Sequence, residues 1–245
     1  MKKIIKVFGI TILLVTLIVS ATLYLKDKKQ DIQEEKVFEE LDNIISEQNQ
    51  DNNYDKEKDY SILFKQNEDM VAWLKIDGTE IDYPIMQTKD RPNYYLRRNF
   101  YKEYSYYGTP YIQENCDINT SDNLIIYGHH INNNKMFGAL ERYKSKSFFD
   151  EHRLITLITK EDTRKYEILY VIETSADNGF KYNKYIDFKN EEEYELFKTN
   201  CEKLSIYKIG GNSNLEYKYI TLSTCDYSQK NGRLIVIARK IDNYD

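Results

Sequence analysis

From about Trp73 onward, short segments rich in β-branched and aromatic residues follow one another between polar loops, and this pattern constrains the fold most. The first segment, AWLKIDGTEIDYPIM, holds an Asp-Gly pair between two apolar runs, which is a strong hairpin signal. The others are GTPYIQ, NLIIYGH, RLITLITK, KYEILYVIE, EYKYITLSTC and GRLIVIARK. So many strands with few helices between them favour a mostly antiparallel sheet or a closed barrel over β-α-β units.

Four segments carry helical patterns instead. DKKQDIQEEKVFEELDNIISEQ has apolar side chains at helical spacing, and the polar NQDNNYDKEKDYS after it resembles a linker. ILFKQNEDMVAWLKI is a helical candidate that runs into the first strand. NKMFGALERYKS and NEEEYELFKTNCEKLSIY are the two helical candidates among the later strands.

The N-terminus carries a run of nineteen residues without a charge, Val7 to Leu25. That is about the length of a helix that crosses a hydrocarbon core. Lysines flank the run on both sides, so the positive-inside rule leaves its orientation open. We expect residues 1–29 to form an uncleaved signal anchor, and a signal peptide cleaved after VSA at residues 19–21 is the alternative.

Charge is divided unevenly along the chain. Residues 1–29 contain six Lys and one Asp, a net charge of +5, against −5 for the whole chain, which leaves −10 on residues 30–245. Nucleic-acid-binding proteins present a basic face, so an acidic body argues against a nucleic-acid partner.

The chain has three cysteines, Cys116, Cys201 and Cys225, so at least one is unpaired within the chain. None belongs to a C-x-x-C pair and no His lies at metal-ligand spacing from them, so we expect no metal site. Cys201 lies on the apolar face of a predicted helix and is expected in the core. A free thiol outside the cell is exposed to oxidation, which favours a functional role for one of them.

Two side chains with suitable chemistry lie at the ends of predicted strands. His129 follows the apolar strand NLIIY, where the sheet holds it while solvent reaches it, and it is either a surface residue or an acid–base catalyst. Cys225 ends another strand, and Arg233 begins the next. If those two strands pair as a hairpin, Arg233 can lower the pKa of the thiol or stabilise an oxyanion. The alternative is a buried core thiol beside a surface charge.

Taken together, these segments resemble class B sortases over roughly residues 62–241. YGHHINNNKMFGAL carries the family's Y-G-H with a Met-Phe pair downstream, and TLSTCDYSQKNGRLIVIARK carries T-L-x-T-C followed by an Arg. IDYPIMQ, YYLRRNF and a helix ahead of the Cys strand are supporting matches. The resemblance implies a closed or nearly closed β-barrel of about eight strands with N-terminal helices. It also implies an anchor over 1–29, a helical stalk or linker over 30–60 and a catalytic domain over 61–245.

The resemblance makes His129, Cys225 and Arg233 the catalytic residues and implies no cofactor. The thiolate would attack a C-terminal sorting signal, of the NPxTx or LPxTG kind, on a secreted protein, and a peptidoglycan amine would resolve the thioester. The enzyme would sit in the cell membrane of a Gram-positive organism as a single-pass protein with its domain outside. His130 would be a solvated neighbour of the site, and Gln113 and Glu114 depart from the family pattern.

Two other readings are compatible with the same residues. A membrane-tethered cysteine peptidase would use water in place of the amine. Papain-like enzymes usually place Cys before His along the chain, whereas here His129 comes first. A non-catalytic extracellular binding module with a structural Cys225 is the third reading.

Overall fold

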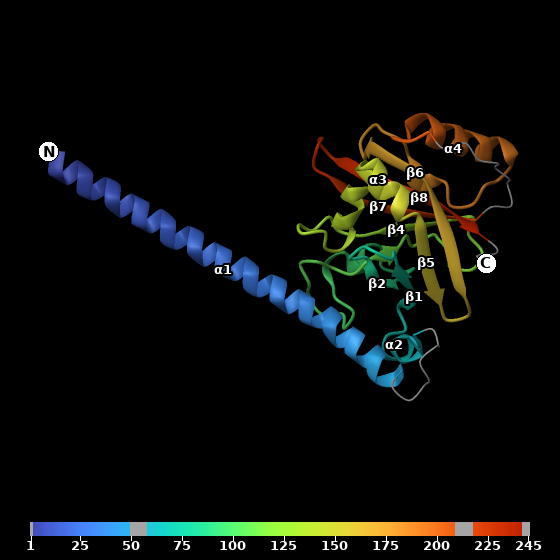
Figure 1. Ribbon diagram of the computed structural model, residues 1–245, viewed down its shortest axis with the longest axis horizontal. Coiled ribbons are helices and arrows are strands. Elements are labelled where there is room, and N and C mark those ends of the chain that lie inside the picture. The colour runs from blue at the N-terminus through green and yellow to red at the C-terminus, as the bar shows by residue number, and fades with distance from the viewer. Residues whose placement is uncertain (1, 50–57, 209–217, 242–245) are drawn as a thin grey trace.

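The computed structural model describes residues 2–49, 58–208 and 218–241. In these ranges eight strands close into a barrel in the order β1-β2-β3-β4-β7-β8-β6-β5 (Figure 1). The strands are β1 Met70–Lys75, β2 Asp82–Met86, β3 Tyr111–Ile112, β4 Asn123–Tyr127, β5 Leu154–Thr159, β6 Thr163–Ser175, β7 Tyr219–Asp226 and β8 Gly232–Ile241. The predicted closed, mostly β barrel is therefore confirmed.

The barrel is mixed, because two of its pairings are parallel. The antiparallel pairs include the predicted hairpins β1–β2 and β7–β8. The pairs β2–β3 and β4–β7 run parallel. The parallel pairing of β4 and β7 is possible because the long excursion through β5, β6 and a helix returns the chain in its original direction. It has a direct consequence for the site, since it brings the carboxyl ends of both strands to one edge.

The strands bury their apolar residues according to their place in the barrel. In β5 buried and partly exposed residues alternate, as in a strand with one face on the core. Most of β7 and the middle of β8 are buried without alternation. The 3₁₀ segment η2, Phe137–Lys144, packs against β7 and β8. Strands covered on both faces carry continuous apolar runs, which explains LIVIA in β8.

The later helices sit on the outside of the barrel. The predicted helix ahead of the Cys strand is α4, Glu191–Leu204, and it packs on β6. The Asn190 side chain caps it by accepting from the Glu193 N–H at 2.9 Å, and three Glu in its first turn favour the helix dipole. NKMFGALERYKS forms η2, a 3₁₀ segment, followed by α3, Lys146–Glu151. The remaining 3₁₀ segments are η1 Tyr94–Arg97 and η3 Tyr182–Lys184.

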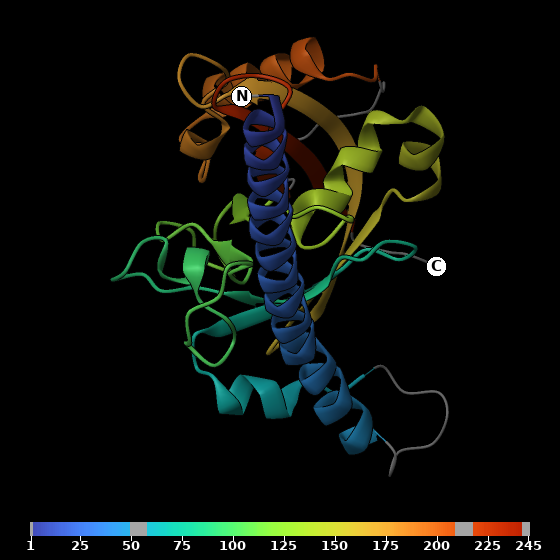
Figure 2. The ribbon, with the colours of Figure 1, turned by 90° about the vertical axis from the view of Figure 1, so that its left-hand side faces the viewer.

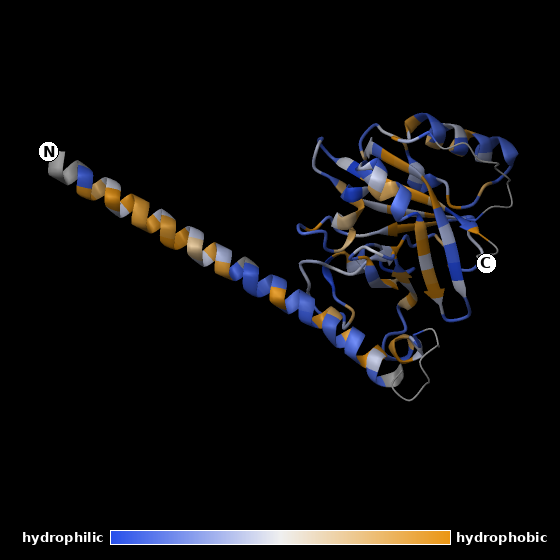
Figure 3. Cartoon of the chain, viewed as in Figure 1, coloured by the Kyte–Doolittle hydropathy of each residue, from blue (hydrophilic) through white to orange (hydrophobic). Residues whose placement is uncertain are grey.

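At the N-terminus α1, Lys2–Asn49, is one long helix, and its first half projects away from the barrel (Figures 1 and 2). That half is apolar and exposed along its length (Figure 3). Leu41 and Ile45, in the last turns, are fully buried against the body, together with residues of α2, Ser61–Gln66. Most of the predicted linker NQDNNYDKEKDYS lies outside the described residues.

Candidate active site

The parallel pairing of β4 and β7 determines where two of the predicted residues meet. Tyr127 is the Cα partner of Ser223 at the carboxyl end of this pair. Two residues later come His129, in the loop just after β4, and Cys225, which is still within β7. Gly128 keeps the two chains together, since its N–H donates to the Ser223 carbonyl at 3.1 Å and its carbonyl accepts from Thr224 Oγ1 at 2.9 Å. The histidine and the cysteine therefore emerge at the same edge of the barrel.

The antiparallel hairpin of β7 and β8 adds the arginine. Cys225 and Arg233 are Cα partners, one pair before the turn closes at Asp226 and Gly232. A Cβ on Gly232 would lie 2.3 Å from the Asp226 carbonyl oxygen, so this turn requires glycine. The predicted proximity of Cys225 and Arg233 is confirmed by this register.

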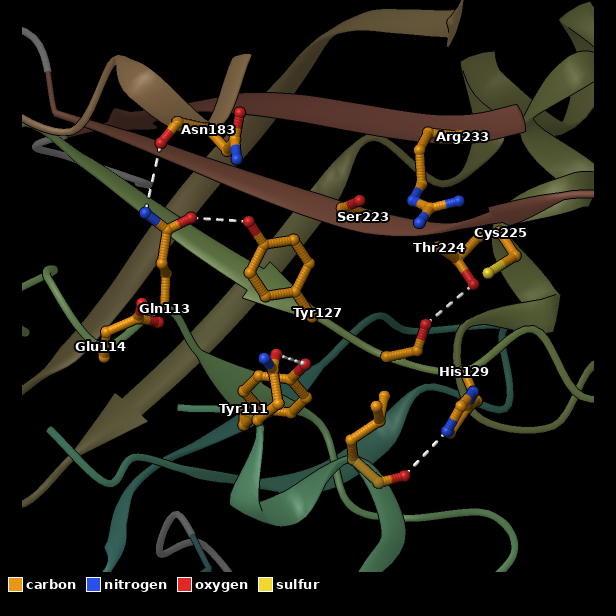
Figure 4. Close-up of a pocket in the computed structure, with 13 residues that line it drawn as sticks. Tyr111, Gln113, Glu114, Tyr127, His129, Asn183, Ser223, Thr224, Cys225 and Arg233 are labelled. Atoms are coloured by element: carbon orange, nitrogen blue, oxygen red, sulfur yellow. Dashed lines mark hydrogen bonds between the residues drawn. The ribbon is translucent and has the colours of Figure 1, made fainter. Parts of the chain in front are cut away.

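The three side chains line one open cavity of about 420 Å³ at this edge (Figure 4). Figure 4 shows the Arg233 guanidinium and the Cys225 sulfur at the same end of the cavity as His129. One Arg233 nitrogen, Nη1, donates to the Gly232 carbonyl at 2.8 Å. The other residues that line the cavity are Asn93, Leu96, Tyr111, Gln113, Glu114, Tyr127, Gly128, Asn183, Ser223 and Thr224.

His129 is held by a backbone carbonyl. Its Nε2 lies 2.8 Å from the Leu96 oxygen, and because a carbonyl only accepts, Nε2 carries the proton and Nδ1 is the unprotonated nitrogen of the neutral ring. Burial lowers the pKa of His129 below its usual value, and the Arg97 cation lowers it further, against the opposing effect of the Leu96 carbonyl. The neutral ring therefore predominates near pH 7.

His130 is not the solvated neighbour that the sequence suggested. Its side chain is half-buried, and its Nδ1 lies 2.9 Å from the carbonyl oxygen of Cys225. The Tyr227 ring packs against the imidazole with a centroid distance of 5.0 Å. The extra histidine thus bonds the backbone of the cysteine, because the loop after β4 folds back beside the β7–β8 turn.

A polar wall that the sequence did not reveal forms the far side of the cavity. Tyr127 donates its hydroxyl hydrogen to Gln113 Oε1 at 2.6 Å, and Gln113 Nε2 donates to the Asn183 carbonyl at 3.2 Å. Tyr111 donates to Asn93 Oδ1 at 2.7 Å, and burial raises the pKa of both tyrosines. Gln113, which departs from the family pattern, is the centre of this wall. Tyr127 stands in the Y-G-H motif, whereas no sequence signal marked Asn183.

The other two cysteines lie away from the cavity and are buried. Cys116 is 1% exposed, and burial raises the pKa of its thiol to about 11. Cys201 is fully buried on α4, as predicted, and burial raises the pKa of its thiol as well. All three cysteines are free. In the described ranges of the chain, no cluster of three or more His, Cys, Asp or Glu side chains is arranged to hold a metal ion.

Comparisons with known proteins point to one family. The family model of the sortase domain matches residues 74–241. Sortase B of Listeria monocytogenes is 34% identical over 177 residues, which cover 71% of this chain and 70% of that protein. Sortase B of Staphylococcus aureus is 28% identical over 221 residues, 89% of this chain and 87% of that one.

A solved structure shares the whole architecture. The Staphylococcus aureus sortase B–substrate complex superimposes with a TM-score of 0.73 at 27% identity, covering 90% of this chain and all of that chain. The eight-stranded closed barrel, the helix between β6 and β7 and the match over residues 74–241 lead to one conclusion. The chain belongs to the sortase family of cysteine transpeptidases, and to its class B.

Proposed function

We propose that this sortase cleaves a C-terminal sorting signal on secreted proteins and transfers the protein to a peptidoglycan amine, with Cys225, His129 and Arg233 as its catalytic residues. One observation carries the proposal: three side chains from β7, β8 and the loop after β4 converge on one cavity. A nucleophile, a proton carrier and a fixed cation are what acyl transfer through a thioester requires.

In the first half of the reaction the Cys225 thiolate attacks the carbonyl carbon of the scissile peptide bond. The resulting oxyanion receives hydrogen bonds from the Arg233 guanidinium, whose five N–H donors suffice for Gly232 and the substrate together. The His129 imidazolium gives its proton to the departing amine as the C–N bond breaks. The acyl group is then bound to Cys225 as a thioester.

The second half runs in reverse with a new amine. The amine attacks the thioester carbon, neutral His129 takes its proton, and the thiolate leaves from the tetrahedral intermediate. The lowered pKa of His129 supports the base role, since the ring is mostly neutral near pH 7. It also means that only a minor fraction of the enzyme carries the imidazolium that the first half needs.

The proposed substrate is supported by the similarity of this chain to a relative whose structure includes a substrate. The S. aureus sortase B that matches this chain along its length was solved as a substrate complex. In this chain the cavity is open and has a polar wall of Tyr127, Gln113 and Asn183. Such a wall offers hydrogen-bond groups to an extended peptide bound across it. We assign the sorting signal of the NPxTx or LPxTG kind to this cavity.

We further propose that residues 1–29 anchor the enzyme as a single-pass protein with residues 61–245 outside the cell. The described part of the chain holds one helix that is long and apolar enough to cross a membrane, near the N-terminus. Its apolar side chains from Val7 to Leu25 are exposed, as lipid-facing residues would be. Residues 30–60 would then join the anchor to the catalytic domain.

The test uses the full chain in detergent micelles and a library of fluorogenic sorting peptides. We expect cleavage that Cys225→Ala and His129→Ala abolish, and a ligated product when triglycine or a diaminopimelate peptide is added. Cleavage that survives Cys225→Ala would disprove the catalytic assignment. Cleavage without any ligated product at high amine concentration would show a hydrolase instead of a transpeptidase.

A further inference from the structure

Residues 31–38 of α1, the stretch just beyond the apolar segment, pack directly on the two loops that hold His129. One is the segment of residues 95–109, which begins within η1 and supplies the Leu96 carbonyl. The other is the loop of residues 128–137, which carries His129 itself. Helix α1 runs through this stretch without a break (Figure 2).

The first connection begins at Glu34, whose side chain is buried although it is a carboxylate. Its Oε2 accepts from the Ser105 hydroxyl at 2.5 Å, and its Oε1 accepts from the Tyr106 N–H at 2.7 Å. A buried carboxylate is stable only when hydrogen bonds compensate its lost hydration. Glu34 therefore fixes the backbone at Ser105 and Tyr106 relative to the helix.

Ser105 connects Glu34 to the backbone around Leu96 through two further hydrogen bonds. Its Oγ accepts from the Gly108 N–H at 2.8 Å, and its own N–H donates to the Arg97 carbonyl at 3.1 Å. Gly108 has φ +64°, and a Cβ there would lie 2.5 Å from the Leu96 oxygen, so the two backbones are in close contact. The Leu96 oxygen is the atom that His129 Nε2 bonds at 2.8 Å.

The second connection reaches the other loop. Phe38 of α1 packs edge-on against Tyr83 with ring centroids 5.1 Å apart. The Tyr83 hydroxyl accepts from the Met136 N–H at 3.2 Å, and the next residue, Phe137, donates its N–H to the His129 carbonyl at 2.9 Å. An ion pair joins Glu35 of α1 to Lys135 of the same loop.

We propose that Glu34 is a positioning residue for His129, acting through Ser105, Gly108 and the Leu96 carbonyl. The juxtamembrane part of α1 is then a structural component of the active site in addition to a tether. This inference rests on the proposed catalytic role of His129. A histidine that hands protons between two amines must hold one tautomer and one orientation, and the Leu96 carbonyl provides both.

The chain offers a matched control and a conservative variant. Glu39 lies on the same helix and is exposed, so Glu39→Ala makes the same change of charge without the buried contacts. Glu34→Gln keeps the length and one acceptor oxygen, so it can still accept from the Tyr106 N–H while its amide donates to Ser105 Oγ. Ser105→Ala breaks the same connection on the barrel side and leaves α1 unchanged.

The experiment measures steady-state kinetics on the full chain in detergent together with ¹⁵N chemical shifts of the imidazoles. The chain has only three histidines, so the ring signals can be assigned by substitution. For Glu34→Ala and Ser105→Ala we expect kcat to fall roughly tenfold or more, with KM within about twofold. We also expect the His129 ring nitrogens to lose the pure Nε2–H pattern. Glu34→Gln should recover most of the activity, and Glu39→Ala should match the wild type.

Two results would overturn the inference. One is an unchanged kcat and an unchanged His129 spectrum in folded Glu34→Ala and Ser105→Ala. The other is a loss in Glu39→Ala as large as in Glu34→Ala. If Glu34→Ala does not fold, Ser105→Ala tests the inference in its place. In that variant the Glu34 carboxylate can still accept from the Tyr106 N–H. An active His129→Ala enzyme would instead reject the proposed function, so the two failures are distinguishable.

Discussion

Lys144 and Asp226 form an ion pair at the turn of the β7–β8 hairpin, with Lys144 Nζ 3.4 Å from Asp226 Oδ1. Asp226 is the residue after Cys225, and its side chain is 2% exposed. The same Lys144 nitrogen lies 2.8 Å from Glu141 and 2.7 Å from Glu173. One cation therefore compensates three carboxylates, from η2, β6 and β7.

Removing this cation should destabilise the fold. Lys144→Met leaves three carboxylates near one another, one of them buried, and we expect unfolding free energy to fall by about 1–3 kcal/mol. Urea unfolding followed by tryptophan fluorescence measures the loss, since Trp73 is the one tryptophan. The control is Lys146→Met, whose partner Asp150 is 51% exposed, and which should cost less than about 0.5 kcal/mol. Equal losses in the two variants would contradict the prediction.

Acid should weaken the same hairpin. Burial works to raise the pKa of Asp226, but hydrogen bonds from Ser228 and the charge of Lys144 outweigh it and hold the pKa below the usual range. A carboxyl with a lowered folded pKa contributes stability above its unfolded pKa of about 4, and this is lost as pH falls through the folded value. Asp226→Asn should therefore be less stable than the wild type at pH 6, and the gap should close toward pH 2. A gap independent of pH would refute this.

The three cysteines should differ in reactivity. Cys116 and Cys201 are buried with raised pKa values, about 11 for Cys116, so their thiolates are scarce and inaccessible at pH 7.5. Cys225 is partly exposed in the cavity. Mass spectrometry after brief iodoacetamide treatment should show one adduct on the native protein and three after denaturation. Native Cys225→Ala should take up none, and an adduct on Cys116 in the folded state would be the opposing result.

Arg233 should not tolerate replacement by lysine. Arg233→Lys keeps the charge but loses the planar set of donors that bonds Gly232 and, in the proposed mechanism, the developing oxyanion. We expect kcat to fall about 10²-fold or more in peptide cleavage, as when an oxyanion donor is removed. Arg239→Lys, also on β8 but outside the cavity, is the control and should retain activity. A nearly active Arg233→Lys enzyme would limit the role of Arg233 to its charge.

The pKa of His129 should rise when Arg97 is replaced. Arg97 is one of the causes that lower this pKa, so Arg97→Gln should shift the His129 titration to higher pH in NMR spectra. In the wild type the folded pKa lies below the unfolded value of about 6.5, so protonation of His129 costs stability as pH falls below that value. Arg97→Gln should reduce this cost. A His129 titration that does not move would show that the Arg97 charge does not contribute to this pKa.

Much of the fold could be predicted because local patterns agree with it. The Asp-Gly turn, the β-branched run RLITLITK and the polar loop before Arg233 each predict one element, and the structure contains all three. GTPYIQ gives only the two-residue strand Tyr111–Ile112, which begins directly after Pro110, a residue with no N–H to donate. The pairing of β4 with β7 could not be predicted, because parallel partners 96 residues apart, such as Asn123 and Tyr219, leave no local signal.

The site also has one part that local sequence patterns predict and one part that they do not. The sequence predicted that Arg233 lies near Cys225 if their strands form a hairpin, because only a short loop separates them, and the two residues are partners in that hairpin. The bonds of His129 to Leu96 and of His130 to the Cys225 carbonyl join distant loops, and their distances could not be read from spacing. His130 was misjudged for this reason. The catalytic roles of His129, Cys225 and Arg233 remain the proposal made above.

The continuity of α1 has a consequence for the reach of the enzyme. A helix rises about 1.5 Å and turns about 100° per residue, so the nine residues from Leu25 to Glu34 span about 14 Å and two and a half turns. If the apolar segment lies in the bilayer, the length of this stretch sets the height of the cavity above the membrane. The rotation of the helix over the same residues sets the direction that the cavity faces. Two added residues would swing the cavity by about 200°, whereas seven would lift it by about 10 Å and nearly restore its heading.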